Sequence, residues 1–352
     1  MHDVITIGTA TQDVFLTVAG AKVLQFAELE AEHRYLAFDY PAKIEVDRIQ
    51  VDTGGGATNT AVTFARFGLR TAFFGKVGDD EPGRQVLGQL GREGVDCSLV
   101  VTTKEHHTGF SAILTSFEGD RTILVHRGAN NTLRGDDIDW DRLKETRWIY
   151  ISSLSGSSGE WLDDIAFFAE EHHISTVMNP GSAQIRQGVG RLCRILATLE
   201  VLFLNRREAA LITGEGPADT AVDVGEAGFD REEWAESMQP AFERLKECGP
   251  KIVVITDGEN GSCAYDGATR WSMPASQVDV GSTVGAGDAY CAAFVGELIK
   301  GGDIARGMLM GTANAAAVIS QVGAKVGILT YDQARRAIEA CEAPTAREVP
   351  GR

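Results

Sequence analysis

The residues best suited to chemistry are a glycine-flanked segment that ends in an aspartate. Gly285, Ala286, Gly287 and Asp288 stand directly before an apolar, helix-like run that starts at Ala289. Glycines ahead of a helix let the backbone turn tightly and leave its N–H groups open to a ligand. Such N–H groups, with the positive end of the helix dipole, favour an anion. Aspartate is also common in the first turn of an ordinary buried helix, so this segment alone leaves both interpretations open.

A second glycine-rich segment precedes another predicted helix. Gly54, Gly55 and Gly56 run into an apolar stretch that carries Asn59 in its first turn and stops at Gly68. Here the backbone can approach a ligand closely, and the Asn59 amide offers both donors and an acceptor. Close helix–sheet packing would explain the same glycines. The spacing matches neither the dinucleotide fingerprint nor a Walker A loop, so neither of those nucleotide folds is predicted.

Strand-like and helix-like segments alternate from about residue 129 onward, which predicts a mostly parallel sheet with helices on both faces. Ligands of such sheets lie at the carboxyl ends of the strands. Asn205 and Thr256 each stand at such an end, and Asp13 comes shortly after the first predicted strand, residues 4–8. We therefore expect these polar side chains near a ligand, although Asp13 on local sequence alone fits an ordinary turn.

Two segments interrupt this α/β pattern with short strand-like pieces. In the first, the pieces are residues 14–18, 35–38 and 43–47. A small sheet cannot bury both faces alone, so we expect it to cover a site or to pair with a second subunit. The predicted division is an α/β core of residues 1–13, 52–104 and 128–345 and a β lid of residues 14–51 and 105–127.

Composition excludes several classes of function. The net charge of −17 argues against binding to nucleic acid or anionic membranes. Six scattered cysteines without a C-x-x-C pair predict reduced thiols in a cytoplasmic protein. There is no signal-peptide pattern and no apolar run of ~18 residues that would span a membrane. The acidic, glycine-rich stretch 214–233 lacks the spacing of a calcium loop and is predicted to be a solvated loop.

Taken together, the chain resembles the ribokinase-like (PfkB-type) family of carbohydrate and nucleoside kinases over about its whole length. Five segments carry the resemblance and stand in the family's order: residues 54–59, 75–80, 205–208, 256–261 and 285–288. The resemblance implies a three-layer α/β sandwich with a mostly parallel central sheet and a small β lid. It also implies a phosphotransferase that uses ATP and Mg²⁺ and has an alcohol group as acceptor.

The resemblance further implies roles for individual residues. Asp288 would be the catalytic base, and Gly285, Ala286 and Gly287 would form the anion hole. The acceptor would be held by Asp13, Gly55, Gly56 and Asn59. The nucleotide would be contacted by Asn205, Thr256, Gly258, Gly261 and Asn314, although a buried helix residue is an equal interpretation of Asn314. Asn205 and Glu208 would hold Mg²⁺ through water.

Three features depart from the family's pattern. Ser282 occupies a position where the family usually has aspartate, so dependence on a monovalent cation such as K⁺ stays open. The strand that ends at Ser152 lacks the acidic residue of ribose-specific members, which disfavours ribose itself. The first lid segment is long, and its aromatic residues suit either an acceptor site or a dimer seam: Phe15, Tyr35, Phe38 and Tyr40.

The leading functional prediction is a kinase acting on a hydroxyl of a sugar or sugar-like substrate. A nucleoside kinase of the same fold is the alternative, with lid aromatics stacking on the base. A non-catalytic sugar-binding regulator is a third reading, against which the presence of Asp288, Asn205 and Glu208 weighs. ADP in place of ATP as donor stays open, although relatives that use ADP are typically longer. Exposed lid edges favour a homodimer formed through the lid.

Overall fold

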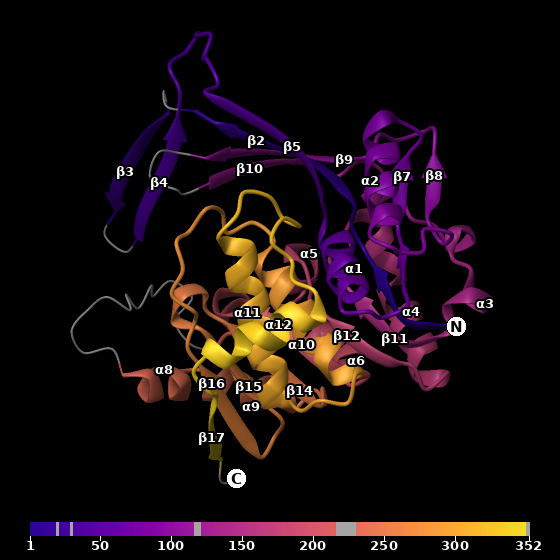
Figure 1. Cartoon of the computed structure of the whole chain (residues 1–352), viewed down its shortest axis with the longest axis vertical. Helices are drawn as coiled ribbons and strands as arrows, with labels where there is room; N and C mark the ends of the chain where they lie inside the picture. Colours follow the sequence, from indigo (N-terminus) through magenta and orange to yellow (C-terminus); the bar gives the residue numbers. More distant parts are fainter. Residues whose placement is uncertain (19–20, 29–30, 116–120, 216–229, 350–352) are drawn as a thin grey trace.

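A nine-stranded sheet forms the centre of the molecule (Figure 1). The computed structural model describes residues 1–18, 21–28, 31–115, 121–215 and 230–349. The strand order is β17-β16-β15-β14-β13-β12-β11-β1-β6, with parallel pairing from β14 to β6 and antiparallel pairing at the β17 edge. The strands are β1 His2–Ile7, β6 Thr71–Phe74, β11 Thr146–Ile151, β12 Ser175–Met178, β13 Leu199–Asn205, β14 Ile252–Thr256, β15 Ser262–Tyr265, β16 Thr269–Met273 and β17 Thr345–Glu348. The predicted mostly parallel sheet is confirmed.

Helices cover both faces of this sheet because its strands are apolar on both sides. In β13, Leu202 and Leu204 pack with the helices of one face, whereas Phe203 packs with those of the other. Helices α4, α6, α7 and α9 lie on the first face, and α1, α10 and α11 on the second. The helices are α1 Gly56–Arg66, α2 Glu81–Arg92, α3 Trp140–Leu143, α4 Leu162–Glu171, α5 Ser182–Ile185, α6 Gly188–Leu196, α7 Arg206–Thr213, α8 Arg231–Ser237, α9 Gln239–Lys246, α10 Ala286–Ile299, α11 Ile304–Ile319 and α12 Tyr331–Ala337. This is the predicted three-layer sandwich.

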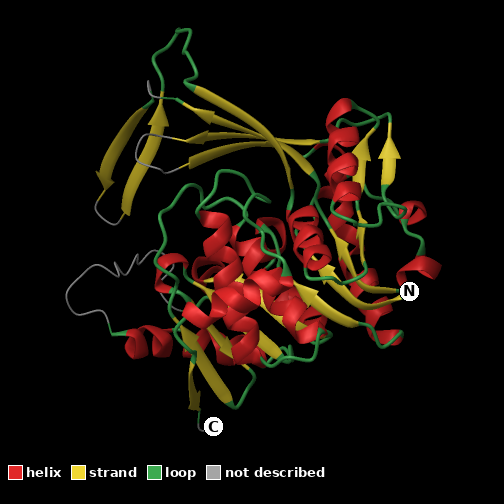
Figure 2. Cartoon of the chain, viewed as in Figure 1, coloured by secondary structure: helices red, strands yellow, loops and turns green. Residues whose placement is uncertain are grey.

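The lid is a separate four-stranded sheet of order β10-β9-β2-β5 that projects from the body beside a two-stranded β3–β4 hairpin (Figure 2). Its strands are β2 Thr11–Thr17, β5 Arg48–Gly54, β9 Gly109–Thr115 and β10 Arg121–His126; the hairpin strands are β3 Lys22–Glu28 and β4 Ala31–Ala37. A further parallel pair joins β7 Lys76–Gly78 to β8 Val101–Thr103.

Two details of the lid differ from the sequence prediction. No strand forms at residues 43–47; the strand begins at Arg48 instead. The lid sheet also starts earlier than predicted, because β2 pairs with β5 all the way from Thr11 opposite Gly54. Asp13 therefore lies within a lid strand and not in a turn of the core.

The predicted helix 234–247 is divided into α8 and α9 at Met238. Pro240 stands in the first turn of α9, where its missing N–H and fixed φ are tolerated, but it would break a continuous helix. Most of the predicted solvated loop 214–233, namely residues 216–229, lies outside the described residues. No described helix is both long and apolar enough to cross a membrane.

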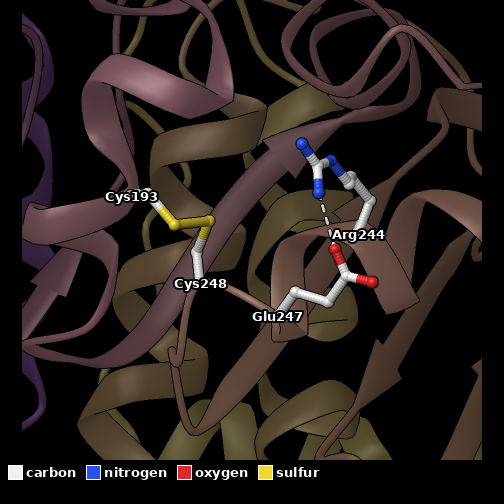
Figure 3. The surroundings of a disulfide bond; sticks show 4 residues. All are labelled: Cys193, Arg244, Glu247 and Cys248. Carbon is white, nitrogen blue, oxygen red and sulfur yellow. Dashed lines mark hydrogen bonds and ion pairs between the residues drawn. A yellow bond between two sulfur atoms is a disulfide. The ribbon is translucent and has the colours of Figure 1, made fainter.

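The prediction of six reduced thiols is wrong, because Cys193 and Cys248 form a disulfide (Figure 3). Cys193 lies in α6 and Cys248 just after α9, and both helices pack against α7. Their Cα atoms are 4.8 Å apart, within the usual range for a disulfide. Fifty-five positions separate the two cysteines in sequence, so their spacing gave no sign of the pairing.

We expect reduction to lower the stability of the fold. A cross-link that closes a loop of this length contributes about 4 kcal/mol in the chain-entropy model. Dithiothreitol should therefore lower the melting temperature by several degrees, and a C193S/C248S double variant should melt at that lower temperature with or without reductant. Titration of thiols in the denatured, non-reduced chain should find the four cysteines that are free in the structure. Six reactive thiols, with a melting temperature insensitive to reductant, would contradict the assignment.

Candidate active site

Asp288 and Asn59, far apart in sequence, meet at the N-termini of two packed helices. Asn59 lies in the first turn of α1 and Asp288 in the first turn of α10, and Nδ2 of Asn59 donates to Oδ2 of Asp288 at 2.8 Å. Burial raises the pKa of the Asp288 carboxyl, and the nearby charge of Asp13 adds to this, whereas the Asn59 hydrogen bond and Lys325 oppose it. Asp288 is thus a carboxylate whose ionisation is disfavoured by burial and which is oriented by an amide.

The glycines before α1 bring backbone close to these carboxylates. A Cβ at Gly56 would lie 3.3 Å from Oδ1 of Asp288 and would overlap the hydroxyl of Ser152. A Cβ at Gly54 would overlap the carboxylate of Asp13. Asp13 thus lies against Gly54, and Ser152 and Asp288 lie against Gly56. The three side chains therefore border the space beside these two glycines.

Asp13 is buried in lid strand β2 and faces this space. Its side chain is 5% exposed, and Oδ1 accepts a hydrogen bond from the Thr11 hydroxyl at 2.8 Å. Burial raises the pKa of the Asp13 carboxyl, while the hydroxyls of Thr11 and Ser111 lower it. Ser111 is the partner of Asp13 on β9, so two lid strands supply polar groups to the same face.

The residues predicted to form the anion hole make a turn before α10, in which the N–H of Ala286 donates to the carbonyl oxygen of Thr283 at 3.5 Å. Gly285 precedes α10 with φ 83, and a Cβ there would lie 2.5 Å from the carbonyl oxygen of Ala324. The N–H groups of the first helical turn have no partner within the helix. A Cβ at Gly287 would meet nothing within 4 Å, so this side of the turn is open. The hydroxyl of Ser282 accepts from the N–H of Val284 at 3.3 Å, a local turn contact.

The predicted nucleotide-binding residues gather at the ends of two neighbouring strands. Asn205 and Thr256 are direct partners at the carboxyl ends of β13 and β14. Asn205 also caps α7: its Oδ1 accepts from the N–H of Glu208 at 2.8 Å, and Oε2 of Glu208 accepts from the N–H of Asn205 at 2.9 Å. Burial raises the pKa of the Glu208 carboxyl. The Asn-x-x-Glu pattern therefore serves as a capping box here.

The loop after β14 is fixed by Asp257, which the sequence did not single out. Its Oδ2 accepts from Arg206 at 3.1 Å, from the Trp234 indole at 2.7 Å and from Asn260 at 2.9 Å. The flanking glycines, Gly258 with φ 54 and Gly261 with φ 109, hold left-handed backbone that favours glycine. The loop is thus preformed beside Thr256.

Asn314 is placed as a structural residue. It is fully buried in α11, where Nδ2 donates to the carbonyl of Ala289 at 2.9 Å and Oδ1 accepts from the N–H of Leu329 at 2.9 Å. Both ends of its amide are used within the protein. This geometry favours the buried-helix interpretation over a contact with a nucleotide.

Comparison with known proteins identifies the family. Residues 15–330 match the model of the pfkB family of carbohydrate kinases. The chain belongs to this family. An uncharacterized sugar kinase of Archaeoglobus fulgidus is 30% identical over 265 residues, which are 75% of this chain and 97% of that protein. A 5-dehydro-2-deoxygluconokinase of Geobacillus thermodenitrificans is 28% identical over 81% of this chain and 84% of its own length. An ATP-dependent ribose-1-phosphate kinase of Halopiger xanaduensis is 26% identical over 79% of this chain and 84% of its own.

Solved structures of low sequence identity share the fold. The Arabidopsis thaliana ribokinase complexed with ribose and ATP superposes with a TM-score of 0.76 at 19% identity, covering 96% of this chain and 99% of the other. A Thermotoga maritima ribokinase gives 0.74 at 20% identity over 96% of this chain and 100% of the other. The chain therefore has the ribokinase-like fold. As a member of the pfkB family it is a carbohydrate kinase, a phosphotransferase with an alcohol group as acceptor.

One charged residue of this carbohydrate kinase was not anticipated at all. Lys325 follows α11 and is 2% exposed, and its Nζ donates to the carbonyl oxygen of Thr53 at 2.7 Å. Its charge acts on both Asp13 and Asp288. Nothing in its local sequence distinguishes it from the surface lysines that are the rule.

Metal binding to this kinase would have to draw on few protein ligands, as far as the described residues show. Within the part of the chain that the structure describes, no three histidine, cysteine, aspartate or glutamate side chains gather around one point. Asn205 and Glu208 offer oxygen donors of the kind Mg²⁺ prefers, but one oxygen of each is already engaged in the cap of α7. They fit a hydrated ion that also binds phosphate oxygens.

Alanine substitutions at the two glycines of the predicted anion hole should separate folding from function. Gly285→Ala forces a side chain into left-handed backbone, at about 1–2 kcal/mol, and against Ala324, so we expect a lower melting temperature together with lost activity. Gly287→Ala has room in the fold but fills the open side of the turn. We expect an unchanged melting temperature with kcat/KM at least about tenfold lower, because the N–H groups would no longer reach a phosphoryl group. Full activity in Gly287→Ala would remove this turn from the site.

Proposed function

We propose that this protein is an ATP-dependent kinase that transfers the γ-phosphoryl group to a hydroxyl of a sugar or sugar-like substrate. One observation carries the proposal: a carboxylate, Asp288, follows directly on a backbone turn suited to an anion and lies near enough to the buried carboxylate of Asp13 to feel its charge. A base and an anion hole on consecutive residues are what phosphoryl transfer to an alcohol requires.

In the proposed reaction the acceptor lies between the lid and the start of α1. Asp13 accepts hydrogen bonds from substrate hydroxyls. Asn59 orients the Asp288 carboxylate toward the substrate hydroxyl that receives the phosphoryl group. Asp288 accepts the hydroxyl proton as the acceptor oxygen bonds to the γ-phosphorus, while the bond from that phosphorus to the bridging oxygen of ATP breaks and ADP leaves. The N–H groups of Gly285, Ala286 and Gly287 stabilise the charge on the transferred phosphoryl group. Gly55 and Gly56 keep the acceptor space free of side chains.

The nucleotide would lie along the ends of β13 and β14, against Thr256, Gly258 and Gly261. Asn205 and Glu208 would hold Mg²⁺ through water, and the bound ion would neutralise phosphate charge. ATP is supported as donor by family membership, and a panel that includes ADP tests it. The cytoplasmic location that we propose rests on ATP, since the Cys193–Cys248 disulfide removes the argument from reduced thiols.

The choice of acceptor stays between sugars and nucleosides. Phe15 is two residues after Asp13 in β2 and is 6% exposed, so it lies on the same lid face and supplies an apolar wall to either substrate. Tyr35 and Phe38, the other lid aromatics that could stack on a nucleoside base, are 53% and 36% exposed. A coupled assay of ADP release across hexoses, pentoses, ribose 1-phosphate, 5-dehydro-2-deoxygluconate and nucleosides decides; turnover of adenosine or inosine alone would reverse our ranking.

Asp288→Asn should abolish phosphoryl transfer while acceptor binding is retained. The amide is isosteric but cannot accept the hydroxyl proton, so we expect kcat to fall by about 10²–10⁴-fold, with acceptor affinity by calorimetry within a few fold of the parent. In the parent, burial raises the pKa of Asp288 above 3.8, so kcat/KM should rise with pH as this carboxyl ionises, with its acid limb above that value. Unimpaired turnover in Asp288→Asn would refute the role of base and leave a sugar-binding regulator as the better description.

We propose that the lid also joins two copies into a homodimer. The outer face of its sheet carries large apolar side chains that are strongly exposed: Ile49 at 66%, Val51 at 53%, Phe110 at 37% and Leu124 at 58%. The strand register puts these four side chains on the face opposite Asp13. Such an apolar patch is typical of an interaction surface.

A charge on this outer face should disrupt the dimer. We expect the parent to show the mass of two chains by light scattering, and Leu124→Glu to show one, because a buried unpaired carboxylate opposes association. Lys22→Glu, a charge change on the exposed hairpin strand β3, is the control. A monomeric parent would contradict the proposal.

A further inference from the structure

The ammonium of Lys325 is a charge of the site that the proposed reaction leaves unused. Its Nζ donates to both the carbonyl oxygen and the hydroxyl of Thr53, at 2.7 and 3.2 Å, and therefore lies against lid strand β5. At 2% exposure it is out of reach of bulk water. Burial of an ionised lysine costs free energy unless anions lie nearby to compensate.

Three carboxylates of the site provide that compensation. The charges of Asp52, Asp13 and Asp288 stabilise the ammonium, although burial still lowers the pKa of Lys325 to about 8. Glu93 also contributes, but it already pairs with Arg66 at 2.6 Å. Among the described residues, neither an arginine or histidine nor Lys325 itself forms a direct ion pair with the other three carboxylates. Lys325 therefore acts on them at longer range, as a buried positive charge near all three.

The backbone around Lys325 also connects the lid to residues 285–287, the turn before α10 that we call the anion turn. The carbonyl of Val322 accepts a hydrogen bond from Nε2 of Gln50 in β5 at 3.0 Å. The carbonyl oxygen of Ala324 lies 2.5 Å from the position that a Cβ on Gly285 would take. Residues 322–325 therefore touch β5 on one side and support the turn before α10 on the other.

We propose that Lys325 is a positioning residue for phosphoryl transfer, whose ammonium fastens lid strand β5 to the segment behind the turn before α10 and supplies a buried positive charge to the side of the site that holds Asp13 and Asp288. It acts through these groups and does not touch the reacting atoms. The inference rests on the roles proposed above for Asp13 and Asp288. Without the ammonium, three carboxylates would share one poorly solvated region, and like charges disfavour ionisation.

The test is Lys325→Met, which keeps the length of the side chain and removes its charge. We expect the acid limb of the pH profile of kcat/KM to move upward by about 1 pH unit or more, and KM for the acceptor to rise as β5 loosens. The matched control is Lys76→Met: Lys76 is also buried, but pairs with Asp137 at 2.7 Å. It should lower the melting temperature and leave the acid limb in place. An unmoved acid limb in Lys325→Met would overturn the proposed charge balance.

A second variant keeps the inference testable if Lys325→Met does not fold. Asp52→Asn removes a carboxylate whose charge raises the pKa of Asp13. Because ionised Asp13 is proposed to hold the acceptor, the acid limb of kcat/KM should move downward, opposite to Lys325→Met. The double variant should return toward the parent profile, because the two charges are removed together. An acid limb in Asp52→Asn at the parent's pH would show that these charges do not act on Asp13.

Hydrogen exchange provides a readout that needs no acceptor. The amides of β5, residues 48–54, should exchange faster in Lys325→Met than in the parent, whereas those of β13, in the core sheet, should not change. Equal protection of β5 in both proteins would refute the fastening role. Because exchange is measured without turnover, a failure of the proposed kinase reaction is distinguishable from a failure of this inference.

Discussion

The hydrogen bond between Asn59 and Asp288 is the contact on which the arrangement of the site depends. It joins the first turns of α1 and α10, two helices that pack against each other on one face of the sheet. Both helices therefore direct their positive N-terminal ends toward the same carboxylate. That convergence supports a negative charge where burial alone would disfavour one, and a phosphoryl group arriving at the turn before α10 would meet the same field.

The glycines of the site follow from this closeness. Helix α1 begins directly after lid strand β5, so the chain passes from lid to core within residues 54–56. A side chain at Gly54 would collide with Asp13, and one at Gly56 would collide with Ser152 and approach Asp288, so both glycines keep the proposed acceptor space free. Because the lid strand leads straight into α1, the position of the lid is coupled through residues 54–56 to the backbone beside Asn59.

Much of this could be predicted from sequence because the signals are local. Alternating strands and helices, and glycines before apolar runs, indicated the sheet, α1, α10 and the position of Asp288. What was missed depends on contacts between distant segments. The Cys193–Cys248 pair, the three donors that gather on Asp257 and the burial of Lys325 all arise from packing that no spacing encodes. Asp13 was assigned to the core segment 1–13 and not to the lid, because strand pairing, which local propensity does not show, extends β2 back to Thr11.

The nucleotide side differs from the acceptor side in how much of it is already engaged. Asn205 and Glu208 hydrogen-bond each other's backbone in the capping box, whereas the turn before Asp288 is open on the side where a Cβ of Gly287 would lie. Glu208 is held in a setting that disfavours its charge, and a bound cation would offset that cost while leaving the cap intact through the oxygen that the cap does not use. The capping box thus orients the two side chains that the family resemblance assigns to the metal. One geometry therefore serves both the cap of α7 and the proposed metal site.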